Sequence, residues 1–108
     1  MTFIEDGRGD MRREIVRQIG PANMLAISGG RVRPIKDGIM LPVGSGYHVR
    51  VTLTPWDVYL VQRVFIRGGR EWVKGERDNV YGDEVSEAAY WASCYRSYDE
   101  LEWPRRPA

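Results

Sequence analysis

The chain has one cysteine and one histidine among its 108 residues, and it has no apolar run long enough to cross a bilayer. A lone cysteine, Cys94, cannot form a disulfide within the chain and offers no second thiol to a metal. The lone histidine, His48, alternates with Arg50 and Thr52 rather than with acid–base partners, so we expect a solvated side chain. The sequence therefore predicts no disulfide scaffold, no metal site, no cofactor and no membrane partner.

Lysine is also scarce, because only Lys36 and Lys74 among the 16 basic residues are lysine. The 15 acidic residues leave a formal charge of +1, which argues against indiscriminate binding to nucleic acid. The preference for arginine is typical of a GC-rich coding sequence. The first seven residues lack the basic-then-apolar order of a signal peptide, and we therefore expect a protein of the cytoplasm.

What the chain does have is a strict alternation of apolar and polar residues over 47–54. This period of two predicts a half-buried strand. The pattern resumes over 58–67 and again at 71–74, and residues 55–57 and 68–69 supply the breaks. Three consecutive antiparallel strands are expected here.

The N-terminal part predicts a flexible arm over residues 1–10. Asp10 is a candidate N-cap for a short helix over 11–19, which Gly20 and Pro21 would end. The apolar run over 23–28 is interpreted as a first buried strand.

A hairpin is predicted next, with Asp37-Gly38 as its two-residue turn between strands at 31–36 and 39–43. Pro34 and Pro42 favour a position at the sheet edge, where a missing backbone donor costs least.

The C-terminal part predicts a helix with Asp83 as its N-cap. Glu84 and Glu87 then fall in the first turn, where the helix dipole favours them, and this reading is preferred to a cation site. The whole order predicts a single α+β domain over residues 11–101, followed by a tail over 102–108. Its antiparallel sheet would have about five to six strands, with a short N-terminal helix and a longer C-terminal helix packed on it.

No residue stands in the context of a catalytic nucleophile, and Cys94 is expected to be a buried structural thiol, so we expect no enzyme. Two binding sites remain as alternatives. A backbone nest for a small anion such as a nucleotide could be formed by Ser28, Gly29, Gly30, Arg31 and Arg33, although a plain Gly-Gly turn is favoured there. A strand face for nucleic acid could combine Arg50, Arg63, Arg67 and Arg70 with Tyr59 and Phe65.

Aromatic residues are in surplus, with four tryptophans and six tyrosines in a short chain. A small domain cannot easily bury them all, and exposed aromatic side chains are typical of interfaces. The candidates for such an interface are Trp91, Tyr95, Tyr98 and Trp103. The leading hypothesis is therefore a homo-oligomer that acts by binding a macromolecule.

Three passages, over 20–30, 51–59 and 80–84, carry a resemblance that covers most of residues 15–98. They resemble small uncharacterised proteins of bacteriophages and mobile elements, especially phages of actinobacteria. The resemblance implies a host-cell cytoplasm, an accessory role in infection, and a host or phage protein as partner. It implies no functional residues.

Overall fold

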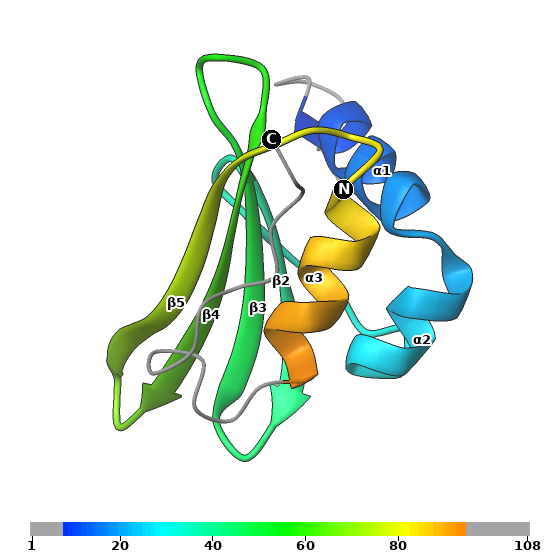
Figure 1. Ribbon diagram of the computed structural model, residues 1–108. Helices are drawn as coiled ribbons and strands as arrows, with labels where there is room; N and C mark the ends of the chain where they lie inside the picture. Colours follow the sequence, from blue (N-terminus) through cyan, green and yellow to red (C-terminus); the bar gives the residue numbers. More distant parts are fainter. Residues whose placement is uncertain (1–7, 95–108) are drawn as a thin grey trace.

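In the computed structural model, which describes residues 8–94, three helices cover one face of a five-stranded antiparallel sheet (Figure 1). This arrangement confirms the predicted α+β fold. The helices are α1 (Arg8–Ile19), α2 (Pro21–Ser28) and α3 (Val85–Cys94). The strands are β1 (Arg33–Ile35), β2 (Gly38–Gly44), β3 (Tyr47–Leu53), β4 (Tyr59–Arg67) and β5 (Arg70–Val80).

The strands follow one another across the sheet in chain order, and each neighbouring pair is antiparallel. Val49 lies opposite Arg63 and Val51 lies opposite Val61, so the alternation seen in the sequence continues in register from β3 to β4. Val49, Val51 and Val61 are fully buried on the face that the helices cover. Arg50, Thr52 and Gln62, at the alternate positions of these strands, lie on the other face.

The helices contribute an apolar stripe each to this core. Ile15 and Ile19 of α1 are four residues apart and therefore lie on one side of the helix, where both are buried. In α3 the buried side is made of the small residues Ala88, Ala89 and Ala92. Small side chains allow the axis of α3 to lie close to the sheet, whereas α1 contributes isoleucines and α2 contributes Met24 and Ile27.

The two edges of the sheet differ in length. β1 has three residues and pairs only with residues 38–40 of β2, and it carries Pro34, as predicted for an edge. β5 has 11 residues, and none of the other described strands pairs with its outer edge. Two irregularities interrupt β5, one at Lys74 and one around Asn79, which has a positive φ of 55°. At each of them β5 holds one residue more than β4, which is the definition of a β-bulge.

One predicted strand is wrong. Residues 23–28 belong to α2, which begins at Pro21 and ends at Ser28. Proline is favoured in the first turn of a helix, and Gly29 closes α2 in the left-handed conformation with φ 66°. A short apolar run fits a buried helix as well as a buried strand, so only these flanking signals could have decided the matter.

The starts of two helices also differ from the prediction. The described part of α1 begins at Arg8, so Asp10 lies in the first helical turn instead of capping it, and Arg8 to Asp10 are no arm. α3 begins at Val85, which makes Glu84 rather than Asp83 the residue directly before the helix. Residues 1–7 and the expected tail over 102–108 lie outside the described residues.

Gly38 is required by a close contact between strands rather than by a turn. Lys36 and Asp37 form the turn, and Gly38 is the first residue of β2. A β-carbon at this position would lie 1.8 Å from the carbonyl oxygen of Val51. Any other residue here would push β2 away from β3.

We expect Gly38→Ala to lower the free energy of unfolding by about 1–3 kcal/mol, because the added methyl group forces a backbone shift. Urea denaturation measures this loss. Gly82→Ala is the control, since its β-carbon would meet only the flexible side chain of Gln18, at 2.8 Å. Equal losses in the two variants would contradict this account of Gly38.

Candidate functional site

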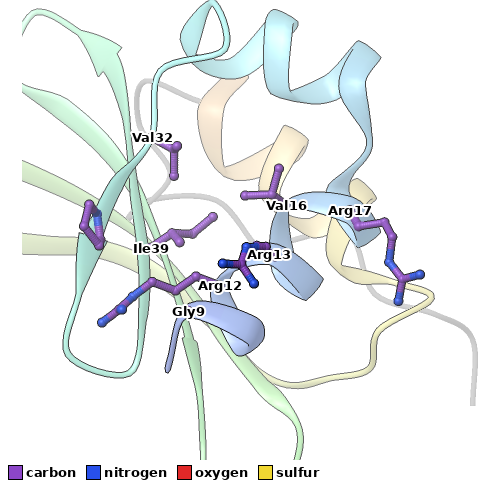
Figure 2. A pocket seen from close by; sticks show the side chains of 8 residues that line it. Gly9, Arg12, Arg13, Val16, Arg17, Val32 and Ile39 are labelled. Carbon is purple, nitrogen blue, oxygen red and sulfur yellow. The ribbon is translucent and has the colours of Figure 1, made fainter. Parts of the chain in front are cut away.

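A groove opens between α1 and the hairpin of β1 and β2 (Figure 2). Its volume of about 470 Å³ lies within the range of ordinary ligand sites. The apolar lining residues are Val16, Val32, Pro34 and Ile39. The remaining lining residues are Gly9, Arg12, Arg13 and Arg17.

The groove connects the core with solvent. Ile39 is 1% exposed and belongs to the core, whereas Val32 is 44% exposed. Val16 is half-buried and lies across the opening from Ile39 and Val32 (Figure 2). Contact between this apolar surface and water is unfavourable in free energy, and a bound apolar group would remove that contact.

Arg12 ties the two walls of the groove together. Its Nε donates to the carbonyl oxygens of Ile35 and Gly38, at 3.2 and 3.1 Å, and its Nη2 also donates to Ile35. A further, longer hydrogen bond of 3.4 Å reaches the carbonyl of Lys36. The guanidinium group thus binds the hairpin turn through backbone atoms, and α1 cannot move away from β1 without breaking these bonds.

A second set of hydrogen bonds fixes α1 against the sheet. The hydroxyl of Tyr59 donates to Gln18 Oε1 at 2.8 Å, and Gln18 Nε2 donates to Glu14 Oε2 at 2.8 Å. Glu14 also accepts a hydrogen bond from Arg17. Burial, followed by the negative charges of Glu14 and Asp57, raises the pKa of Tyr59 above its ordinary value.

The rim of the groove is cationic. Arg13 pairs with Asp10 at 2.6 Å, and Arg17 pairs with Glu14, both within α1 and both largely exposed on the arginine side. Exposed pairs of this kind are worth little, so these guanidinium groups can exchange partners readily. Residues 8–37 hold seven basic and three acidic side chains, a net charge of +4 in a chain whose total is +1.

The predicted anion nest does not present its donors to a ligand. Gly29 and Gly30 follow the C-terminus of α2, and their N–H groups donate to the carbonyls of Leu25 and Met24 at 2.9 and 3.1 Å. The N–H of Arg31 donates to Ser28 at 3.2 Å, and its Nε donates to the same carbonyl. Arg33 is exposed on β1.

The predicted nucleic-acid residues are spread over three places. Arg63 is 2% exposed on the helix-covered face, where it donates to the Ala92 carbonyl at 2.7 Å, and Tyr59 is buried on the same face. Arg50 lies on the opposite face, in an ion pair of 2.7 Å with Glu71. Only Phe65, Arg67 and Arg70 come together, near the β4–β5 turn.

Of the predicted interface residues, Trp91 lies half-buried in α3 with its ring against Tyr90, 6.4 Å between centroids. Tyr95, Tyr98 and Trp103 lie outside the described residues. Cys94 is exposed rather than buried, and its hydrogen bond with Tyr90 raises the pKa of that tyrosine.

His48 is half-buried rather than solvated, and its Nδ1 lies 3.1 Å from the carbonyl of Gly46. Glu84 is buried, accepts a hydrogen bond from the backbone of Tyr81 at 3.1 Å and lies 3.5 Å from Arg77, a structural arrangement. Within residues 8–94, no three side chains of histidine, cysteine, aspartate or glutamate gather as they would around a metal ion.

Sequence reasoning missed the groove itself. Its apolar lining comes from α1, the start of β1 and β2, and no local pattern links these segments. The only signal in the sequence was Val32, an apolar residue between two arginines that had no assigned place on a buried face.

No protein-family model, no curated protein and no solved structure matches this chain. None of the helices within residues 8–94 combines the length and the apolar character that crossing a membrane requires.

Replacing Arg12 should loosen the groove far more than replacing its neighbour. We expect Arg12→Ala to lower the free energy of unfolding by about 2–3 kcal/mol, because buried carbonyls lose a charged donor. Arg13→Ala removes only an exposed pair and should cost less than about 1 kcal/mol. Chemical denaturation of both variants tests this, and similar losses would show that Arg12 does not hold the hairpin.

Stability should also depend on Tyr59 at high pH. Because the pKa of Tyr59 is raised in the folded protein, the unfolded chain loses the hydroxyl proton at a lower pH than the folded chain does. The contribution of the protonated hydroxyl to stability is therefore complete below about pH 10.0 and is lost as the pH rises above it. Tyr59→Phe should therefore be less stable than the wild type at pH 7, by about 1 kcal/mol for the lost hydrogen bond. Denaturation at increasing pH should show this difference narrowing above the ordinary tyrosine pKa, and a constant difference would contradict the assignment.

Proposed function

We propose that this chain acts by binding, without chemistry of its own, and that its groove receives an acidic, apolar segment of another protein. The observation that carries the proposal is the meeting of an apolar surface, formed by Val16 and Val32, and arginine guanidinium groups in one groove between α1 and β1. Neither feature alone would select a partner.

The apolar part of the groove supplies affinity. Val32 is 44% exposed and Val16 is half-buried, so a leucine or phenylalanine of the partner would remove both from water. Each square ångström of apolar surface buried in this way contributes about 25 cal/mol. The buried Ile39 gives the groove a fixed floor, which limits the entropy lost on binding.

The arginine rim supplies selectivity. Residues 8–37 have a net charge of +4, and this field attracts an acidic segment and repels a basic one. Arg13 and Arg17 now pair with acids of their own helix, at exposed positions. A partner carboxylate could replace either acid at little cost.

The resemblance to small phage proteins suggests a bacterial cell during infection as the setting, with a host or phage protein as the partner. A second copy of the chain would serve as the occupant of the groove if the protein forms a homo-oligomer. The test below distinguishes these occupants.

The experiment is selection of binding sequences from a library of random short peptides displayed against the purified protein. We expect enrichment of sequences that combine leucine, isoleucine or phenylalanine with aspartate or glutamate. Val32→Asp should weaken binding of a selected peptide by about tenfold or more, because it places a carboxylate in the groove.

Val73→Asp is the matched control, since Val73 is 46% exposed and lies on β5, away from the groove. Enrichment of basic peptides, or equal losses in the two variants, would overturn the proposal. If wild-type protein self-associates in sedimentation and Val32→Asp abolishes this, the occupant is a second copy.

A further inference from the structure

The β4–β5 turn brings two arginines together without a compensating acid. Gly68 and Gly69 have φ angles of 60° and 78°, as in the tight two-residue hairpin turn that only glycine forms without strain. This turn sets Arg67 directly opposite Arg70 in the sheet register. Like charges that face each other directly across two strands destabilise the pair.

The surrounding charges do not relieve this repulsion. Arg67 and Arg70 are exposed, and neither forms an ion pair with another described residue. Residues 63–74 hold four basic side chains and one acidic side chain, Glu71. Glu71 is directed to Arg50 at 2.7 Å, on the face of the sheet away from the helices. The turn from Arg67 to Arg70 therefore carries a net charge of +2.

A row of aromatic rings begins beside the two arginines. Trp72 lies 5.8 Å from Phe65, and Phe65 lies 5.0 Å from Tyr47, measured between ring centroids across three neighbouring strands. The guanidinium of Arg63 lies 4.2 Å from the centre of the Tyr47 ring, and that of Arg70 lies 5.9 Å from Trp72.

The Phe65 ring in the middle of the row packs against the β2–β3 turn, and Trp72 at the end of the row is partly exposed. A β-carbon at Gly46 would lie 2.8 Å from the Phe65 ring, so glycine at this position lets Phe65 pack against the β2–β3 turn. The Trp72 ring contacts Phe65 and lies near the Arg70 guanidinium, and its 43% exposure leaves indole surface on which another flat ring can stack.

We propose that this hairpin tip, made of Phe65, Arg67, Arg70 and Trp72, binds single-stranded nucleic acid. Arg67 and Arg70 would each contact a phosphate, which removes their mutual repulsion, while Trp72 stacks on an unpaired base. Arginines that follow the backbone and aromatic rings that stack on bases are the two means by which such proteins hold a single strand. A duplex hides its bases from Trp72 and would offer only phosphates. The tip is separate from the groove, so this proposal does not depend on the groove's occupant.

The test is fluorescence anisotropy with a labelled oligo(dT) of about 12 nucleotides, close to the length such sites cover. Two phosphate contacts predict that log K falls against log salt with a slope of about −1.4 between roughly 50 and 200 mM. Arg67→Ala and Arg70→Ala should each reduce this slope by about 0.7.

Removing the ring tests the second half of the site. Trp72→Ala should weaken binding by about 5- to 150-fold, the usual effect of losing one base stack. Trp72→Phe keeps an aromatic ring, so its affinity should fall between those of the wild type and Trp72→Ala. This variant also tests the ring if Trp72→Ala does not fold. Circular dichroism checks the fold of each variant.

The controls are matched in type and placed elsewhere. Trp56 is 84% exposed in the β3–β4 connection, at the other end of β4, and Arg33 is exposed on β1, at the opposite edge of the sheet from β5. Trp56→Ala and Arg33→Ala should leave both affinity and slope unchanged. The proposal is overturned by absence of binding at low salt, by a preference for duplex over single strand, or by equal losses in control and tip variants.

Discussion

The arrangement of the N-terminal half depends on the hydrogen bonds that the Arg12 guanidinium group donates to the β1–β2 hairpin. β1 has only three residues and one neighbouring strand, and such a short edge strand has little stability of its own. By donating to the carbonyls of Ile35 and Gly38, Arg12 joins this strand to α1 through backbone atoms. The groove exists because helix and hairpin are held together at the turn end while Val16 and Val32 stay apart. A lysine, with one compact ammonium group, could not make the same set of bonds.

A formal charge of +1 hides a strong separation of charge along the chain. Residues 8–37 have a net charge of +4 and residues 63–74 of +3, whereas residues 75–94 have one basic and five acidic side chains. The fold places the first two regions at different parts of the sheet, around α1 and at the β4–β5 turn (Figure 1). The net charge of the whole chain is therefore a poor guide to what its surface attracts, because salt screening confines the electrostatic field of each charged region to about 10 Å or less.

Local patterns predicted the sheet well and the sites poorly. The alternation over 47–54 fixes which side chains of β3 are buried, and Val49 and Val51 are indeed fully buried. Residues 23–28 carry no such period, and in the sequence only the flanking Pro21 and Gly29 mark the helix that forms there. Arg63 looked like a surface cation on its strand, yet α3 covers it and its guanidinium donates to Ala92. The groove could not be predicted, because it depends on how helix and hairpin meet, which no sequence period records.

The two bulges in β5 have a consequence for how the molecule behaves at high concentration. A long, flat edge strand offers its free N–H and C=O groups as a template on which further chains can add. In β5 the extra residues at Lys74 and near Asn79 break the regular spacing of these groups and increase the local twist. No uninterrupted run of matching donors and acceptors extends along its 11 residues. The strand is therefore long enough to carry the hairpin tip, while its two bulges make its free edge a poor template for the addition of another strand.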